Sequence, residues 1–166
     1  MRNVYLFQFS LVYPGKVVML PYSIATVWSY AKRNPNVEKE YQLGGLYFIK
    51  KPVETVLNDL VNPDVCAFSC YVWNWKYNLE LAKKIKITYP HCLIIFGGPQ
   101  VPDNDDTFHQ RYPWVDLLVH GEGEYQFLEV LLANLTSKPA FQKIPGISYL
   151  DEHANCTHQT SPPSRV

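Results

Sequence analysis

The sequence predicts an α/β domain built on a mostly parallel, doubly wound, five-stranded sheet. Short apolar strands alternate along the chain with segments whose apolar residues recur at helical spacing, an order typical of β-α-β units. Two of the expected strands, 92–96 and 115–119, are almost uninterrupted apolar runs, as in strands that helices cover on both faces. A chain of 166 residues is also long enough to bury a substantial core as one domain.

The individual elements follow from the spacing of apolar residues and from proline positions. We expect strands at 3–9, 41–49, 64–70, 92–96 and 115–119, with 146–150 as an extra edge strand. Apolar stripes predict helices over 24–31, 53–60, 79–89 and 127–135, with a short helix within 103–111. Pro21 and Pro52 stand just before the first two helices, where the first turn tolerates proline.

Five such units fit two doubly wound, Rossmann-like arrangements. One is the flavodoxin-like strand order 2-1-3-4-5, and the other is a Rossmann half; the pattern leaves both open. We place the folded domain at residues 1–150. Residues 151–166 have no periodicity and contain two prolines, so we expect them to form a tail or an inter-domain linker.

Composition excludes several classes of partner. The formal charge is zero and the isoelectric point is about 6.9, so the chain has no electrostatic footprint for nucleic acid or anionic membranes. No apolar run approaches the ~20 residues that span a membrane. The N-terminal run MRNVYLFQFSLVY is better interpreted as a strand than as a signal peptide, because polar residues interrupt it. Four cysteines in mostly apolar settings predict reduced thiols in a cytoplasmic protein.

Four loops follow the carboxyl ends of the expected strands, where open parallel sheets bind their ligands. They are residues 10–15, 69–75, 97–100 and 120–124. These loops carry glycines, hydroxyls, amides and aromatic rings but little charge. The ligand that suits them is large, flat and uncharged over most of its surface.

Two glycine-containing loops have two readings each. Gly97 and Gly98 either let a ligand approach the backbone or merely allow a tight turn, and the sequence does not separate these. Glu122 and Glu124 either form a carboxylate pair or stand at a helix start, where the helix dipole favours acids; we prefer the second reading. Two acids here also argue against a phosphate site.

The sequence lacks the motifs that nucleotide-binding, metal-binding and catalytic sites would need. Neither Gly-x-Gly-x-x-Gly nor a P-loop occurs. Cys66 and Cys70 on one strand would lie about 13 Å apart, too far to share a metal ion. The histidines show no ligand spacing, and no catalytic triad can be assembled, although Ser69, Cys70 and His120 could share the loop rim. We therefore predict no metal ligand and no catalytic residue in this chain.

A family resemblance comes from the combination of these loops. The run DVCAFSCYVWNWKYNLELAKKIKITYPHCLIIFGGPQVP, followed by VDLLVHGEGE and IPGISY, resembles the N-terminal cobalamin-binding domain of cobalamin-dependent radical S-adenosylmethionine enzymes. The resemblance covers about residues 1–150 and depends on the order and spacing of the motifs, since each motif alone is weak. It implies a flavodoxin-like cobalamin-binding fold.

The resemblance also implies which residues bind the cofactor. Residues 69–71 would line a cavity for the nucleotide tail of cobalamin with 97–100 opposite, while 72–74 would approach the corrin and 121–123 its edge. Trp73 and Trp75 would cover the lower corrin face, or else pack between helix and sheet. The implied set is Ser10, Tyr13, Ser69, Cys70, Tyr71, Val72, Trp73, Asn74, Gly97, Gly98, Pro99, Gln100, Gly121, Glu122 and Gly123.

Two departures from the better-known patterns change what is expected. The loop SLVYPGK after the first strand lacks the histidine of Asp-x-His-x-x-Gly, so no histidine lower ligand to cobalt is expected. The radical motif Cys-x-x-x-Cys-x-x-Cys is also missing, because position 73 is Trp73. S-adenosylmethionine and a [4Fe-4S] cluster are therefore expected only in a following barrel domain that this chain does not contain.

The resulting expectation is a cobalamin-binding module of a radical S-adenosylmethionine enzyme, most simply a methyltransferase. The module alone would not be catalytic, and it would be either a fragment or a stand-alone carrier that meets its barrel in cis or in trans. The alternative is a non-enzymatic protein-interaction domain of the same fold. A flavin binder ranks last, because the first loop lacks a Ser/Thr-rich phosphate site. Leucine at Gly98 is expected to block cobalamin while leaving the fold intact.

Overall fold

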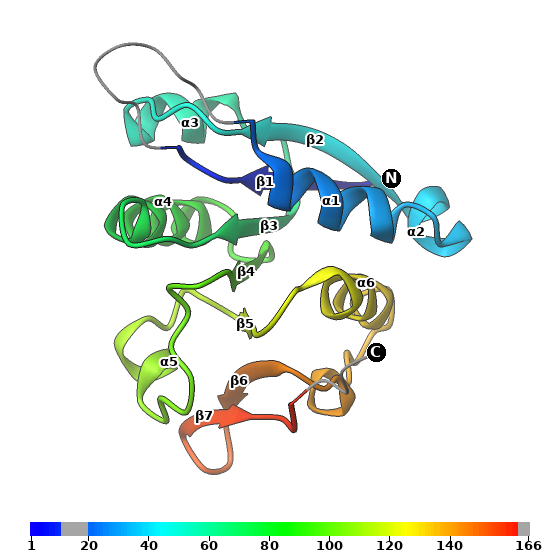
Figure 1. Cartoon of the computed structure of the whole chain (residues 1–166), viewed down its shortest axis with the longest axis vertical. Coiled ribbons are helices and arrows are strands. Elements are labelled where there is room, and N and C mark those ends of the chain that lie inside the picture. Colours follow the sequence, from blue (N-terminus) through cyan, green and yellow to red (C-terminus); the bar gives the residue numbers. More distant parts are fainter. Residues whose placement is uncertain (11–19, 163–166) are drawn as a thin grey trace.

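The computed structural model describes residues 1–10 and 20–162 as one α/β domain around a seven-stranded sheet (Figure 1). The strand order is β2-β1-β3-β4-β5-β6-β7. The first five strands of this order are parallel, and β6 and β7 are antiparallel to their neighbours. The strands are β1 (Arg2–Phe7), β2 (Tyr41–Tyr47), β3 (Pro63–Ser69), β4 (Leu93–Gly97), β5 (Leu117–Val119), β6 (Ile147–Asp151) and β7 (Cys156–Gln159).

The parallel part confirms the predicted fold class and decides between the two topologies, because its order is the flavodoxin-like 2-1-3-4-5. The expectation that residues 151–166 form only a tail is corrected for residues 151–159. Strand β6 extends to Asp151, and β7 pairs with it in the register Ser148↔Gln159 to Asp151↔Cys156. Strand β7 was not predicted, because four mostly polar residues show no alternation of apolar and polar side chains. The turn at residues 152–155 brings it alongside β6.

Helices cover both faces of the sheet (Figure 1). One face carries α1 (Tyr22–Ala31), α2 (Pro35–Glu40) and α6 (Glu124–Ala133); the other carries α3 (Val53–Asp59), α4 (Trp75–Thr88) and α5 (Phe108–Arg111). A 3₁₀ turn, η1 (Phe141–Lys143), precedes β6. Helix α2 was not predicted, because Val37 is its one buried apolar residue; Asn34 caps it by accepting from the Asn36 amide.

The two faces of the sheet differ in the size of their side chains. On the α3–α4–α5 face, Phe7 stacks on Phe68 at 4.5 Å between ring centroids, and Phe68 lies 5.1 Å from Phe96. On the α1–α6 face, Ala67 of β3 stands beside Ile95 of β4, and the next β4 residue on that face is Gly97. The first face is therefore filled by aromatic rings close to the carboxyl ends of the strands, whereas the second has room there.

Within residues 1–10 and 20–162, no helix combines the length and the apolar character needed to cross a membrane. The four cysteines are free thiols, and three of them, Cys66, Cys70 and Cys92, are buried.

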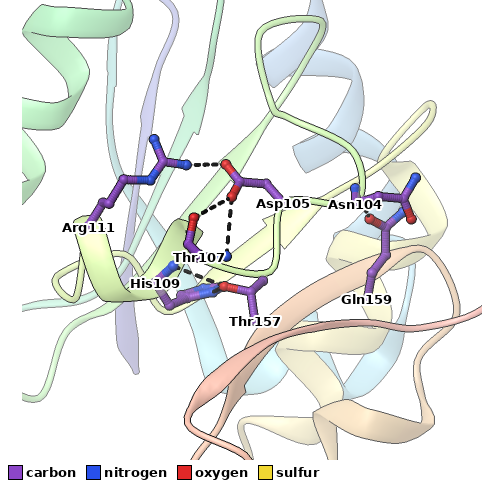
Figure 2. Close-up of polar contacts among 7 residues, drawn as sticks. All are labelled: Asn104, Asp105, Thr107, His109, Arg111, Thr157 and Gln159. Atoms are coloured by element: carbon purple, nitrogen blue, oxygen red, sulfur yellow. Dashed lines mark hydrogen bonds and ion pairs between the residues drawn. The ribbon is translucent and has the colours of Figure 1, made fainter.

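Hydrogen bonds join strand β7 to the segment that follows β4 (Figure 2). The hydroxyl oxygen of Thr157 accepts from the His109 amide at 3.0 Å and lies 2.9 Å from His109 Nδ1. The Asn104 amide donates to Gln159 Oε1 at 2.8 Å. His109 is 2 % exposed, and this burial lowers its pKa to about 4.

We predict that His109 makes the fold acid-sensitive. Its folded-state pKa of about 4 lies below the ordinary value of 6.5, so the unfolded chain binds a proton in this window that the folded chain does not. Stability present above pH 6.5 is lost as the pH falls toward 4, by about 3–4 kcal/mol at ~1.4 kcal/mol per pKa unit. Urea unfolding at pH 7.5 and 4.5 measures this. His109→Asn should flatten the dependence, and the exposed His153→Gln should not. Equal slopes in all three proteins would refute it.

Candidate functional site

A cavity of about 230 Å³ opens at the carboxyl ends of β1, β3, β4 and β5, between the sheet and helices α1 and α6. This is the place where a 2-1-3-4-5 sheet reverses its strand order and where such sheets bind ligands. The lining is mostly apolar, with two serine hydroxyls, one phenol and one carboxylate. The lining residues are Leu6, Ser23, Ile24, Val27, Ala67, Phe68, Ser69, Tyr71, Ile95, Gly97, Gly98, Pro99, Val119, Gly121, Glu122, Gly123 and Phe127.

Gly97 leaves part of this space free. A Cβ atom at this position would meet Val119 Cβ at 3.6 Å, which is ordinary van der Waals contact. The backbone therefore does not require glycine here. The missing side chain, together with the small Ala67 on the same sheet face, leaves the cavity unfilled at the end of β4.

Gly98 is required by the turn itself. Its φ is +99°, and a Cβ atom would lie 2.9 Å from the Cys70 oxygen and 3.0 Å from the Cys70 nitrogen. Around it, the Cys70 amide donates to the Gly97 oxygen at 2.7 Å and the Gln100 amide donates to the Cys70 oxygen at 3.1 Å. Of the two interpretations of this loop, the requirement of a tight turn applies to Gly98. The expectation that leucine at this position leaves the fold intact is wrong, because that side chain would collide with backbone.

Asn74 and Cys70 shape the loop from beneath and do not line the cavity, which corrects their predicted placement. Both are fully buried. Asn74 Oδ1 accepts from the Tyr71 amide at 2.8 Å, and its Nδ2 donates to the Ser69 oxygen at 3.0 Å and to the Phe9 oxygen at 3.2 Å. Cys70 belongs to the core on the opposite face of the sheet, where burial raises the pKa of its thiol to about 12. These two side chains hold the loop and are sealed from solvent.

An aromatic pair stands at the rim of the cavity. Tyr71 and Trp73 are stacked, with ring centroids 4.6 Å apart and planes 7° from parallel. The Tyr71 hydroxyl lies 3.2 Å from the Ser23 hydroxyl of α1, and Trp73 Nε1 donates to the Phe9 oxygen at 3.1 Å. Trp73 keeps 38 % of its surface exposed.

Trp75 has a different role from Trp73. It packs in the core on the α3–α4–α5 face, with its ring centroid 5.7 Å from that of Phe96 and 6.2 Å from that of Phe108. The packing interpretation is therefore correct for this tryptophan. Only Trp73, among these two, is available at the rim.

The loop after β5 forms another wall of the cavity. Gly121 and Gly123 have φ of +82° and +93°, in the left-handed region that favours glycine. Between them Glu122 lines the cavity, while Glu124 opens α6, where the helix dipole favours an acid. The two carboxylates therefore stand in different surroundings.

His120 does not meet Ser69 or Cys70, as the sequence had suggested it could. Its ring contacts Ser148 of β6 and Asp103 of the loop after β4. Neither partner could be found from sequence, since both are distant along the chain and lie in segments without a motif. Among residues 1–10 and 20–162, no group of three or more potential ligands is placed to hold a metal ion.

The cavity thus brings together about half of the predicted residues. Ser69, Tyr71, Gly97, Gly98, Pro99, Gly121, Glu122 and Gly123 line it. Ser10, Cys70, Val72, Trp73, Asn74 and Gln100 lie outside its lining, and Tyr13 lies outside the described residues. The helix residues Ile24, Val27 and Phe127 were missed, because their apolar spacing was interpreted as core packing. Ser23 was missed because a single hydroxyl at a helix start gives no sequence signal.

Comparison with known proteins finds relatives among methyltransferases. No family model matches the chain. It is 38% identical over 129 residues to the cobalamin-dependent radical SAM methyltransferase TokK of Streptomyces tokunonensis, which covers 78% of this chain and 19% of TokK. It is also 38% identical over 132 residues to the 2-(S-pantetheinyl)-carbapenam-3-carboxylate methyltransferase of Streptantibioticus cattleyicolor, covering 80% of this chain and 19% of that enzyme. Both relatives are methyltransferases, and TokK is a cobalamin-dependent radical S-adenosylmethionine enzyme.

Solved structures agree on the fold. The cobalamin-dependent S-adenosylmethionine radical enzyme OxsB, with aqua-cobalamin and S-adenosylmethionine bound, aligns with a TM-score of 0.72 and 22% identity over 99% of this chain and 23% of OxsB. Apo OxsB aligns with a TM-score of 0.74. The resemblance inferred from the loop motifs is therefore confirmed. The chain spans about a fifth of the length of its methyltransferase relatives, 19% in both cases.

We predict that the adjacent glycines respond differently to alanine. Gly98→Ala should lower the free energy of unfolding by about 1–3 kcal/mol, because it combines a positive φ with a backbone clash. Gly97→Ala should change it by less than about 0.5 kcal/mol, because its Cβ meets only ordinary contacts. Urea titrations of the two variants measure the difference. Equal destabilisation by both would contradict the roles assigned to the two positions.

Proposed function

We propose that this chain is a cobalamin-binding module that works with a radical S-adenosylmethionine methyltransferase barrel, in cis or in trans. The observation that carries the proposal is a largely apolar cavity at the carboxyl ends of β1, β3, β4 and β5 in a chain whose homologues are cobalamin-dependent. The cavity stands at the switch point of the sheet, the position at which this fold presents its ligands.

The size of the cavity suits one part of cobalamin. Pockets that enclose a whole drug-sized ligand measure roughly 300–1,000 Å³, and this one measures about 230 Å³. A corrin ring would not enter it, whereas the aromatic base of the nucleotide tail would. The corrin would then lie across the strand exits, over the glycine turns that let a flat ligand approach the backbone.

The residues of this chain fall into two groups, one facing the nucleotide tail and the other facing the corrin. The hydroxyls of Ser69 and Tyr71 and the turn of Gly97 and Pro99 face the cavity and would hold the tail. Residues 121–123 form the opposite wall. Val72 and Trp73, which lie outside the cavity lining, would belong to the corrin side. Among them Trp73 offers a partly exposed ring that the Phe9 hydrogen bond holds in place.

We propose further that no histidine of this chain ligates the cobalt from below. The loop SLVYPGK after β1 contains no histidine, and the cavity lining contains none among the described residues. The flat surface available near the corrin would be that of Trp73. When bound, cobalamin supplies a cobalt centre that can carry a methyl group, and this chain's residues would bind and orient it.

The remaining functions belong to the proposed partner barrel. S-adenosylmethionine and a [4Fe-4S] cluster would be held there, since this chain has Trp73 where a radical motif would need its third cysteine. We place the module in the cytoplasm, which the free cysteines support. Zero net charge gives no reason to expect nucleic acid or a membrane as a partner.

One observation supports the alternative of a protein-interaction domain. Tyr22, Val72 and Trp73 lie near the strand exits and are 77%, 75% and 38% exposed. Exposed aromatic and apolar side chains of this kind also form protein interfaces. Cobalamin binding by the chain alone distinguishes the two functions.

We predict that the chain binds hydroxocobalamin and that Gly97→Leu weakens the affinity by roughly tenfold or more. Leucine would occupy the cavity, and its Cβ would meet the neighbouring Val119 only at ordinary van der Waals distances. Visible-absorption titration followed by gel filtration measures both. Bound cobalamin should show the spectrum of the form in which no nitrogen base ligates the cobalt from below.

Ala154→Leu is the matched control, since Ala154 lies exposed in the turn between β6 and β7, outside the cavity lining. It should bind as the wild type does. Unchanged binding by Gly97→Leu would remove the cavity from the site. A colourless wild-type protein at high cobalamin concentration would favour the interaction domain, unless addition of a relative's barrel restores binding.

A further inference from the structure

His120 connects three elements immediately behind the cavity. It follows β5 directly, and its side chain is 9% exposed. Nε2 lies 2.7 Å from the Ser148 hydroxyl of β6, and Nδ1 lies 2.9 Å from Asp103 Oδ1. Its amide donates to the Gly146 oxygen at 2.8 Å.

His120 and Asp103 stand in the two loops that form adjoining walls of the cavity, whereas Ser148 and Gly146 belong to β6 and its start. His120 precedes residues 121–123, and Asp103 belongs to the loop that starts with residues 97–99. We propose that His120 is a positioning residue, which fastens these two loops to each other and to β6 and so sets the width of the cavity. Its effect on cobalamin affinity rests on the proposed function, but the connection itself does not.

The protonation state of the ring decides how well this connection is made. A carboxylate only accepts, so Nδ1 must carry the proton that it donates to Asp103. In the neutral ring Nε2 then accepts from the Ser148 hydroxyl, and every partner is matched. A second proton would turn Nε2 into a donor and force the buried Ser148 hydroxyl to rotate away. Burial lowers the pKa of His120 and opposes that proton, although Asp103 favours it.

Asp103 is the charged side chain in contact with the His120 ring, because the neighbouring charged groups have other surroundings. Asp105, in the same loop, pairs with Arg111 (Figure 2). Asp106 and His158 line a separate cavity, of which Ser148 is also a lining residue. Glu122, in the turn after His120, faces the main cavity.

The loop that carries Asp103 is itself fixed from β7. The Asn104 amide donates to Gln159, and Thr157 binds His109 (Figure 2). Asp103 therefore starts from a defined position although its side chain is 71% exposed. The connection runs from β7 through this loop and His120 to the wall formed by residues 121–123.

Ser148, His120 and Asp103 have the order of contacts of a hydrolytic triad, but the serine is not placed to attack a substrate. Ser148 is 2% exposed and pairs in the sheet with Leu118 on one side and Gln159 on the other. Its hydroxyl therefore serves as a hydrogen-bond partner that orients the imidazole.

The test compares His120→Gln with His158→Gln in the full chain. Nitrogen-15 NMR of the wild type should show a neutral His120 ring protonated at Nδ1 at pH 7.5. His120→Gln should speed hydrogen exchange of the Gln100 and Val101 amides about tenfold, because their turn loses its connection. It should also weaken hydroxocobalamin binding about tenfold at pH 8. The wild type should lose affinity as the pH falls below 6.5 and His120 takes up its second proton, and His120→Gln should abolish that loss. His158→Gln should change none of these.

A second variant tests the proposal independently, in case His120→Gln does not fold. Asp103→Asn alters an exposed side chain and should lower the pKa of His120 further, because the carboxylate that raises it is gone. An Nε2-protonated ring, or unchanged exchange and unchanged pH dependence in His120→Gln, would overturn the proposal. If the wild type binds no cobalamin but exchange responds as stated, the proposed function fails and the positioning role of His120 stands.

Discussion

The whole site depends on one close contact between backbones, where the turn after β4 meets the end of β3. Gly98 lies against the Cys70 peptide at a distance that admits no Cβ atom, and hydrogen bonds from the Cys70 and Gln100 amides close the contact on both sides. This contact fixes where β3 ends. Asn74 then ties the same loop to the Ser69 and Phe9 oxygens. With both strand ends fixed, the rim residues Tyr71 and Trp73 have a rigid support.

The cavity itself results from unequal packing on the two faces of the sheet. Phe7, Phe68 and Phe96 pack against one another on the α3–α4–α5 face close to the strand ends. On the α1–α6 face Ala67 and Gly97 leave that volume free, and α1 and α6 close it from the side. Close-packed interiors rarely tolerate such a space without a use, because lost contacts reduce stability. The unfilled volume is thus the feature that most directly suggests a ligand.

Most of the fold could be predicted from the sequence, because long periodic segments determine it. The five parallel strands were expected from their apolar runs, and the loops that follow four of them were identified before any contact was known. Helix α2 and strand β7 were missed, since six or four mostly polar residues carry too little periodicity. Within the site, the loop residues 97–99 and 121–123 were found, whereas Ser23, Val27 and Phe127 were not. A helix residue that lines a cavity has the same spacing as one that lines the core. The partners of His120 could not be predicted either, because Asp103 and Ser148 contact it only in the folded tertiary structure.

The most direct test of the central claim is to map, by amide chemical shifts, where hydroxocobalamin contacts the chain. We predict shift changes concentrated at Ser69, Gly97 and residues 121–123, with Val27 on α1 also affected and the residues of the α3–α4–α5 face unchanged. Changes confined to the exposed edge of β2, or spread evenly over the surface, would contradict it. Either of those results would mean that the cavity beneath the glycine turns is not the place where cobalamin binds.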